Sequence, residues 1–362
     1  MKYRVFACAA LQAAAMLSWA SVSHADIGIY SSLDSMSYSE PLPIHQIADD
    51  WQGKLEDGNL AFTYNRFEVG VSWNNWRIGY VARYDYRLEF SEDTALFYYE
   101  EENNVRRTRN RVYDVYLDVM HQRSQGFAVH YDWQVQDNLR ITPSLAYLHA
   151  NDIIDGTLKG QAEFYGDNTF SGNLGIDYYY LEDFLFERPV DTGKHRGHGY
   201  SFDLDIQWQP LDHWQIRLKT YDLLARIHWD GLPRTRARAD TEPVQTDDPF
   251  ERYRDASVQG RESDANFHQK LPTRAMLRSA YQYKSLHLAA EIYQEPDQTF
   301  VFPSIGYEIG GWTFTLLGEP FIEAAGARIT HRWLSFSFVA DRLDFKEAKY
   351  VNLNLALNVP LF

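Results

Sequence analysis

Cysteine is nearly absent from this chain: the 362 residues include a single one, Cys8. Cys8 lies inside an apolar N-terminal segment that we expect to be removed. The rest of the chain therefore cannot form a disulfide or a thiolate zinc site, and it has no cysteine nucleophile.

Basic residues are also too few for one class of function. The chain carries 35 lysines and arginines against 50 aspartates and glutamates, a formal net charge of −15. Proteins that bind nucleic acid need a basic surface to displace the counterions of the phosphate backbone. The charge balance therefore argues against nucleic acid as a partner.

Long hydrophobic runs are missing after Ala25. The mean hydropathy is −0.46, and no later stretch approaches the roughly 20 apolar residues of a membrane helix. Aromatic residues nevertheless make up 15% of the chain, with 25 tyrosines and 10 tryptophans. A polar average with many aromatics fits a closed membrane β-barrel, in which alternate residues face lipid and water.

The first 25 residues have the three parts of a secretory signal peptide. Lys2 and Arg4 are the basic start, residues 5–20 are apolar, and Ser23-His24-Ala25 places small residues before a cut at Asp26. A membrane anchor is the alternative, but the run is short for a span and no charge cluster follows it. We predict a cleaved signal peptide at 1–25 and one barrel domain at 26–362.

Alternation with a period of two dominates the remaining sequence. From Tyr200 to Trp208 every second residue is apolar, and Ser201, Asp203 and Asp205 lie between them. A helix would place Tyr200 and Asp203 on one face, so the pattern predicts a strand. The alternation recurs in further segments, which lie near 27–38, 60–73, 78–90, 111–121, 127–135, 139–149, 157–165, 173–181, 214–227, 274–283, 286–293, 300–308, 312–319, 324–332, 334–342 and 350–361.

Turn signals between these segments are of two kinds. Asn74-Asn75, Asp137-Asn138, 210–212 and Gly310-Gly311 are short, whereas 91–108, 187–197 and 230–265 are long and polar. Short turns at one end and long loops at the other are typical of outer-membrane barrels, with the short turns periplasmic and the longer loops extracellular.

The strand count conflicts with a rule for bacterial barrels. The segments number about 17, whereas single-chain bacterial barrels have an even number of strands. The conflict falls between 91 and 138, where a long loop and two short turns do not alternate sides. We therefore predict an all-β chain forming a single transmembrane antiparallel barrel of about 16 strands, with 14 and 18 still open.

Tryptophans cluster at the predicted strand ends. Amphipathic indoles at such positions form the aromatic girdle of a membrane barrel, whereas a sandwich core would favour mid-strand positions. The predicted interfacial girdle consists of Trp73, Trp76, Trp208, Trp214, Trp312 and Trp333.

The C-terminus carries the closest resemblance to a known class. Residues 351–361 alternate apolar with polar side chains, and Phe362 ends the chain. This resembles the terminal strand that the outer-membrane barrel assembly machinery recognises, with Leu355, Leu357, Val359 and Phe362 as the signal. Phe362 is out of phase with its row, which a bulge or a strand end at Pro360 would explain.

That resemblance is to the porin-like outer-membrane barrels of Gram-negative bacteria as a class, and to no single family over the whole chain. It implies an outer-membrane location reached by export. It also implies three partners: the barrel assembly machinery, outer-membrane lipid and lipopolysaccharide.

If the apolar row faces lipid, the other row lines the lumen. Charged lumen side chains either set the selectivity of an aqueous path or pair with each other and fill the barrel. A barrel of this size is wide enough for a channel, which favours the first reading. The predicted pore-lining residues are Arg83, Asp85, Arg87, Asp114, Asp118, Arg140, Asp203, Asp205, Arg217, Lys219, Arg274 and Arg278.

Two charged loops allow more than one reading. The loop at 230–265 is either an inward constriction, as in general porins, or an extracellular loop of polar composition. Glu100-Glu101-Glu102 with Arg106-Arg107 and Arg109 could meet cations and phosphates of lipopolysaccharide, or could simply be solvated.

Catalytic and metal sites find little support. His195 and His198 have metal-like spacing without a third ligand nearby, and we predict no metal and no cofactor. His198 with Asp203 and Asp205, or His149 with Asp152, could form an acid–base set, yet no nucleophile motif accompanies them. We expect a porin or channel for small polar solutes. The alternatives are a non-transporting barrel that acts as a scaffold, export partner or lipopolysaccharide binder, and, less favoured, an outer-membrane hydrolase. The oligomeric state is left open.

Overall fold

A computed structural model describes residues 27–49, 51–105, 109–165, 170–183, 190, 195–241 and 257–361. The predicted signal peptide at 1–25 and the terminal Phe362 lie outside the described residues. Among the described residues, no helix has the length and apolar character needed to cross a membrane.

The architecture is a closed antiparallel barrel. One sheet of 17 strands contains a ring of 14, and the other three strands lie outside the ring. The ring closes where β1 pairs with β17, from Gly28 opposite Pro360 to Tyr38 opposite Tyr350. In ring order the strands are β1 (Ile27–Ser39), β2 (Leu60–Trp73), β3 (Trp76–Phe90), β4 (Arg111–Tyr131), β6 (Leu139–Phe164), β8 (Gly197–Leu211), β9 (Trp214–Thr241), β11 (Arg274–Tyr283), β12 (Leu286–Gln294), β13 (Thr299–Ile309), β14 (Trp312–Glu319), β15 (Ala324–His331), β16 (Leu334–Ala340) and β17 (Tyr350–Pro360).

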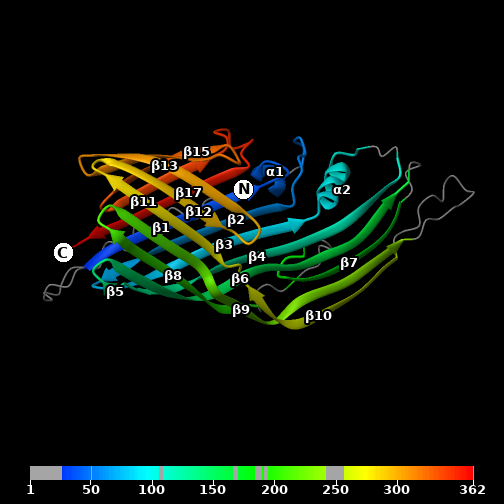
Figure 1. The fold of residues 1–362 in the computed structure, drawn as a ribbon. Helices are drawn as coiled ribbons and strands as arrows, with labels where there is room; N and C mark the ends of the chain where they lie inside the picture. The colour runs from blue at the N-terminus through cyan, green and yellow to red at the C-terminus, as the bar shows by residue number, and fades with distance from the viewer. Residues whose placement is uncertain are drawn as a thin grey trace, which may run out of the picture.

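The three outside strands continue ring strands end to end. β5 (Trp133–Gln136) follows β4, β7 (Phe170–Tyr180) precedes β8 along β6 and β9, and β10 (Ser257–Lys270) precedes β11 along β9. The start of β4, the end of β6 from Ile154 and the end of β9 from Arg234 thus join β7 and β10 in a sheet that projects beyond the ring, towards the right in Figure 1. We call this projecting sheet the extension.

In the described part of the chain, two helices lie at the extension end of the ring. α1 (Ile44–Ala48) follows β1, and α2 (Glu92–Glu102) follows β3. The Ser91 hydroxyl caps α2 by accepting a hydrogen bond from the Thr94 backbone N–H at 3.1 Å. The Thr94 hydroxyl then joins the helix to β4 through the backbone of Tyr116.

The ring of 14 strands is within the range that the sequence predicts, but two expected boundaries are wrong. Segments 111–121 and 127–135 are one strand followed by β5, and 139–149 and 157–165 both belong to β6. Arg123 of β4 pairs with Asp152 and Ser124 pairs with Ala150, so Asn151 of β6 has no residue opposite it. This extra residue reverses which side chains of β6 face outward. Such a bulge interrupts the apolar alternation without interrupting the strand.

The long connections contain more regular structure than their composition indicates. Residues 91–108 include α2, and the 230–265 segment includes the C-terminal end of β9 and the first part of β10. These strands lie in the extension, where no apolar row is needed, so they have the composition of a loop. The middle of that segment, 242–256, lies outside the described residues.

Two predicted short turns have the backbone that tight hairpins require. Asn74 has φ of 50°, and Gly310 and Gly311 have φ of 57° and 80°. The two-residue turns that match the twist of antiparallel strands need positive φ at both central positions, as at Gly310-Gly311, or at the first one, as at Asn74. We call this end of the barrel the short-turn end.

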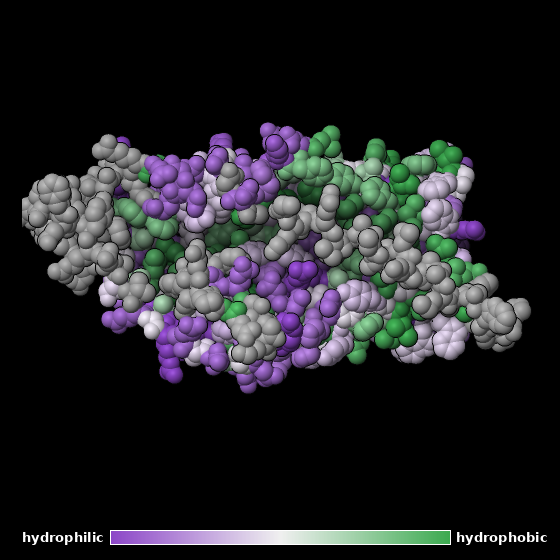
Figure 2. Space-filling view, turned by 180° about the vertical axis from the view of Figure 1, so that it is seen from behind, coloured by the Kyte–Doolittle hydropathy of each residue, from purple (hydrophilic) through white to green (hydrophobic). Residues whose placement is uncertain are grey.

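An apolar belt covers the outside of the ring. Phe127, Leu145 and Leu316 are 64%, 56% and 67% exposed. Viewed from behind, the apolar residues gather at the barrel end of the molecule (Figure 2). Of the predicted girdle, Trp73, Trp76, Trp208 and Trp214 are exposed beside short turns, and Trp312 and Trp333 are half-buried at strand ends.

The last strand behaves as an ordinary member of the ring. β17 pairs with β1 without a register shift and ends at Pro360, so no bulge lies there. The Leu361 backbone N–H then donates to the Ile27 carbonyl oxygen at 2.8 Å. Leu355, Leu357 and Val359 lie in this ladder.

Candidate functional site: the barrel lumen

Polar residues on the inner face of the ring form connected networks. The alternation that turns Phe67 and Val69 outward turns Arg66 and Glu68 inward on β2. Arg83 and Asp85 are inward on β3 in the same way. Buried charges are stable only when they are paired and hydrogen-bonded, so their partners define the lumen.

The first network surrounds Glu68. Its carboxylate accepts hydrogen bonds from the Tyr30 hydroxyl at 2.7 Å and lies 2.5 Å from His130 Nε2. Arg66 pairs with Glu68 at 3.3 Å and also with Asp203. Four strands therefore meet at this network across the lumen.

The second network surrounds Arg83. Its guanidinium forms two parallel hydrogen bonds with Asp222, at 2.7 and 2.8 Å, and a third with Asp85 at 2.7 Å. Ser201 donates to Asp222, and Gln122 donates to Asp85. Arg83 and Asp222 are 4% and 2% exposed, so this is a desolvated ion pair.

Asp222 occupies a bulge in the barrel wall. Phe202 pairs with Leu224, but Leu204 pairs with Thr220, so β9 carries extra residues opposite Asp203. Asp222 has φ of 56°, and its backbone N–H donates to Asp203 at 2.9 Å. Non-glycine residues rarely adopt this conformation, and when they do the surroundings must hold it in place. The bulge turns the Asp222 carboxylate into the lumen.

A third network lies on the opposite wall. Glu291 accepts from Arg278 Nε at 3.0 Å and from Arg328 Nη2 at 2.9 Å. Glu291 is 1% exposed. Two arginines on one buried carboxylate leave this wall with an excess of positive charge.

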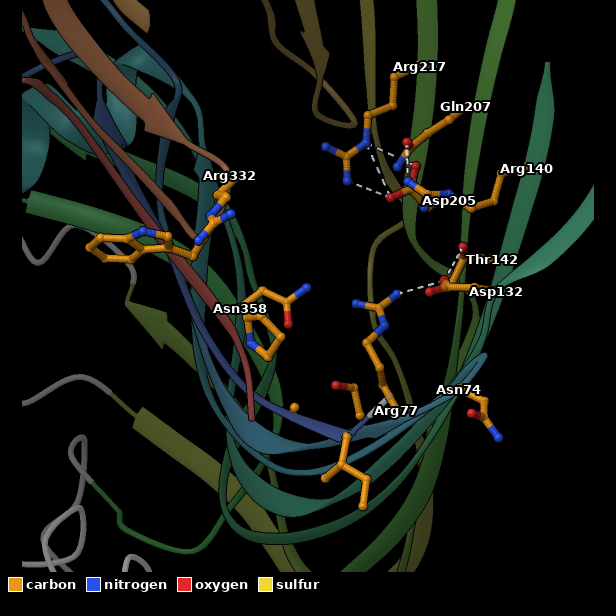
Figure 3. A pocket seen from close by; sticks show the side chains of 15 residues that line it. Asn74, Arg77, Asp132, Arg140, Thr142, Asp205, Gln207, Arg217, Arg332 and Asn358 are labelled. Atoms are coloured by element: carbon orange, nitrogen blue, oxygen red, sulfur yellow. Dashed lines mark hydrogen bonds and ion pairs between the residues drawn. The ribbon is translucent and has the colours of Figure 1, made fainter. Parts of the chain in front are cut away.

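A vestibule of about 640 Å³ opens at the short-turn end (Figure 3). In it, Arg217 pairs with Asp205 and Arg77 pairs with Asp132. The other charged lining residues are Arg140, which donates to Gln207, and Arg332. The lining thus holds four arginines against two aspartates, which gives the mouth a positive bias.

The vestibule continues inward and narrows. It shares Arg77, Asp205 and Arg217 with a cavity of about 280 Å³. That cavity in turn shares Asp34 and Arg66 with one of only about 40 Å³. The narrow cavity has room for a few water molecules.

Tyrosines, an arginine and a glutamate line the narrow cavity. The Arg274 guanidinium lies 4.2 Å from the centre of the Tyr64 ring and 5.2 Å from that of Tyr221. Tyr293 and Glu295 complete this part of the lining. We call these five residues the constriction.

Several polar atoms at the constriction have no partner among the described residues. They are the Tyr64 hydroxyl, Arg274 Nε and Glu295 Oε2. Burial is the largest cause that raises the pKa of Glu295, just beyond the end of β12, to about 7, while Arg274 and Arg87 oppose the shift. Unsatisfied buried polar groups at a narrow point are suited to bind water or a passing polar solute.

A further cavity of about 490 Å³ lies at the extension end. Its lining includes Arg87, Asp118, Asp155 and Pro296. Pro296 directly follows Glu295, so this cavity adjoins the constriction there, and the two share no lining residue.

The structure distributes the predicted pore-lining residues along this route. Arg140, Asp203, Asp205, Arg217 and Lys219 line the two cavities at the short-turn end. The others divide into four groups: Arg274 at the constriction, Arg83 and Asp85 in the buried network, Arg278 beside Glu291, and Arg87 and Asp118 at the far cavity.

Asp114 lies apart from the other predicted residues. It is in the part of β4 that extends beyond its pairing with β3, and its carboxylate accepts from Gln161 at 2.7 Å. It is exposed beside α2 rather than inside the ring.

Other lumen residues escaped the sequence analysis. Arg66 and Glu68 have the same alternation signal as the predicted residues and could have been found by it. Asp222 could not, because a bulge decides its direction. Glu295 lies in a connection after β12, where alternation gives no information.

The histidines and aspartates considered as acid–base sets do not lie together in the structure. His198 faces outward on β8 with Tyr200, whereas Asp203 faces the lumen with Ser201. Asp152 lies 3.4 Å from His121 rather than beside His149.

Comparisons with known proteins give only distant likenesses. No family model matches the chain, and no curated protein matches it. Among solved structures, the toluene transporter TodX of P. putida is 9% identical, with 94% of this chain and 91% of that chain covered and a TM-score of 0.41. The toluene transporter TbuX of Ralstonia pickettii is 10% identical, with 94% and 90% covered and a TM-score of 0.36. The monoaromatic hydrocarbon channel CymD is 9% identical, with 93% and 88% covered and a TM-score of 0.30. Likenesses this weak do not assign a solute to this chain.

Proposed function

We propose that this chain is an outer-membrane channel that passes small polar solutes through the barrel lumen, with anions favoured at the short-turn mouth. The observation that carries the proposal is the series of polar cavities of about 640, 280 and 40 Å³, which share lining residues from one to the next. A barrel serving only as a scaffold has no need of connected polar cavities.

The membrane location rests on the outer surface. Exposed apolar side chains such as Phe127, Leu145 and Leu316 would be costly in water over a whole belt, and lipid is the environment that accommodates them. The exposed tryptophans at the short turns fit the interfacial girdle of such a barrel.

The preference for anions rests on the vestibule charges. Its two aspartates are paired with Arg217 and Arg77. Arg140 and Arg332 have no carboxylate partner among the described residues, so the lining has net positive charge. Rings of arginine and lysine favour anions in pores.

The constriction sets the conductance. Tyr64 and Tyr293 occupy the lumen where the cavity falls to about 40 Å³. Only small solutes or hydrated ions could pass without a shift of these side chains. We therefore expect a low conductance, limited at this layer.

A single observation favours a second function. The Arg83–Asp222–Asp85 network fills part of the lumen with buried charge pairs, as a non-transporting barrel would require. In that case the extension and loops would be the working parts, as in a surface scaffold or a lipopolysaccharide-binding protein.

Planar-bilayer recording of the purified, folded protein separates the two functions. A channel gives single-channel currents, and the Tyr64→Ala/Tyr293→Ala variant gives larger ones because two aromatic rings leave the constriction. Tyr281→Ala, on the exposed outer face, is the matched control and should conduct like the wild type. If neither the wild type nor the widened variant conducts, while both migrate as folded barrels, the channel function is wrong.

A further inference from the structure

Four histidines lie in one row across four neighbouring strands. His149 on β6 pairs with His198 on β8, His198 pairs with His228 on β9, and His228 pairs with His268 on β10. In Figure 1, β6 and β9 run from the ring into the extension, β8 lies in the ring, and β10 lies in the extension. We call these four residues the histidine row. It collects four of the 12 histidines of the chain.

The row lies on the outer surface, at the edge of the apolar belt. His149 follows Leu145 and Tyr147 on the outward face of β6, and both of these are 56% exposed. Beyond His149, the next outward residue on β6 is Asn151. The row therefore lies on the opposite face of the wall from the proposed pore and does not depend on it.

Two of the histidines face each other through ring nitrogens. His149 Nδ1 lies 3.4 Å from His198 Nδ1, and the Tyr147 hydroxyl lies 2.8 Å from the same His198 nitrogen. Two nitrogens bound to one tetrahedral zinc ion, at about 2.0–2.1 Å each, lie about 3.3–3.4 Å apart. The two imidazoles thus have the separation of a pair of metal ligands.

The other two histidines also have features of ligands. The His228 and His268 rings lie 4.4 Å apart. His228 Nε2 lies 2.9 Å from the Asp230 carboxylate, and His228 Nδ1 is buried without a partner. A carboxylate on one ring nitrogen orients a histidine so that the other nitrogen can bind a metal ion.

We propose that the histidine row binds divalent transition-metal ions, one at His149/His198 and one at His228/His268. Imidazole nitrogen suits Zn²⁺, Cu²⁺ and Ni²⁺, whereas Ca²⁺ and Mg²⁺ prefer oxygen. Among the described residues, no three histidine, cysteine or acidic side chains converge on one point. Each pair therefore supplies two ligands, and water or the Tyr147 hydroxyl completes the sphere. Such open sites bind a metal ion reversibly.

Copper and zinc titrations of the full chain test the proposal. The protein carries a purification tag without histidine, and migration as a folded barrel on unheated gels is checked for every variant. We expect the electron paramagnetic resonance spectrum of added Cu²⁺ to show nitrogen coupling from imidazole, and calorimetry with Zn²⁺ to give two sites.

The variants separate the row from other histidines. His149→Ala/His198→Ala should lose one site, His228→Ala/His268→Ala the other, and the four-fold variant both. Asp230→Asn should weaken the second site by roughly 10-fold or more. His45→Ala/His213→Ala removes two histidines outside the row and should bind like the wild type.

Two outcomes would overturn the proposal. One is a wild-type protein without imidazole-coordinated copper. The other is a folded four-fold variant that binds both metals as the wild type does. His149, His198 and His228 line neither the vestibule nor the constriction, and His268 borders only the cavity at the extension end. The substitutions therefore leave the narrow part of the lumen unchanged, and His→Gln replacements serve if an alanine variant fails to fold.

Discussion

Glu295 is the residue at which burial and charge conflict most directly. It is 4% exposed, and one of its carboxylate oxygens has no partner among the described residues. Arg274 and Arg87 favour its charged form, while Asp85 and Asp222 oppose it. Burial outweighs the arginines, so this carboxyl keeps its proton to a higher pH than an ordinary glutamate.

The sign of the resulting pH dependence follows from linkage. The pKa of Glu295 is raised from 4.5 to about 7, so between these values the folded protein binds more protons than the unfolded chain. Stability from this group is therefore complete below pH 4.5 and is lost as the pH rises towards 7.

Glu295→Gln should abolish this loss. At pH 8 we expect the variant to need more urea to unfold than the wild type, with a free energy of unfolding higher by roughly 3 kcal/mol at most. At pH 4.5 the two proteins should have the same free energy of unfolding. Unfolding in detergent at both pH values measures the difference. An equal effect of the substitution at the two pH values would contradict the expected titration.

Arg83 is the residue whose loss should be most costly. Arg83→Ala would leave Asp222 and Asp85 buried without their main partner. Removing one member of a buried ion pair typically costs about 3–5 kcal/mol. Arg238→Ala breaks the exposed pair with Asp240 in the extension and should cost about 1 kcal/mol or less. Thermal unfolding of the two variants compares them, and similar losses would mean that the Arg83 network is already solvated.

At the scale of elements, β6 combines two environments in one strand. Its outward residues from Ile141 to Tyr147 belong to the apolar belt, whereas its continuation beyond Ala150 pairs with β7 in the extension. The alternation of apolar residues is strong only in the first part. A single strand therefore looks in sequence like a strand followed by something else.

Leu145→Arg tests the lipid contact of this strand. An arginine in the middle of the membrane face of a barrel costs about 2–4 kcal/mol, falling to 0–1 kcal/mol near the interface. Asn151→Arg lies on the same face of β6, beyond the belt, and should be nearly neutral. Refolding into lipid vesicles measures both. Equal tolerance of the two substitutions would indicate that the belt does not face lipid.

At the scale of the whole molecule, the ring and the extension depend on different interactions. The ring closes by continuous pairing through β1 and β17, without help from β7 or β10. The β9–β10 hairpin from Leu232 to Ala265 forms strand pairs only within the extension.

Replacing residues 234–263 with a short turn should therefore leave the ring folded. We expect the shortened protein to migrate as a folded barrel and to retain the conductance of the wild type, because the vestibule and constriction keep their lining. Failure of the ring to fold would show that the extension is needed for closure.

The positive charge of the vestibule predicts that the channel prefers anions to cations. Arg140→Gln/Arg332→Gln removes the two vestibule arginines without carboxylate partners, so the ratio of chloride to potassium permeability should fall towards one. Reversal potentials in a salt gradient measure this ratio. Arg196→Gln, outside the lumen cavities, is the control, and an unchanged ratio in the double variant would place the selectivity elsewhere.

The sequence by itself determined the class of structure. Lipid outside and polar groups inside impose a period of two on every ring strand, and this period is visible in β2, β3, β8 and β17 without any tertiary information. Asn74 and Gly310-Gly311 marked their turns for an equally local reason, since few residues tolerate positive φ.

Only the tertiary structure decided which of these residues meet. The register of β6, β8 and β9 brings Arg83 to Asp222 and places four histidines in a row, and register depends on hairpins and bulges that alternation does not reveal. Strands in the water-exposed extension need no apolar row, so β10 has the composition of a loop. The period of a strand is set locally, whereas its neighbours are set by the closure of the whole ring.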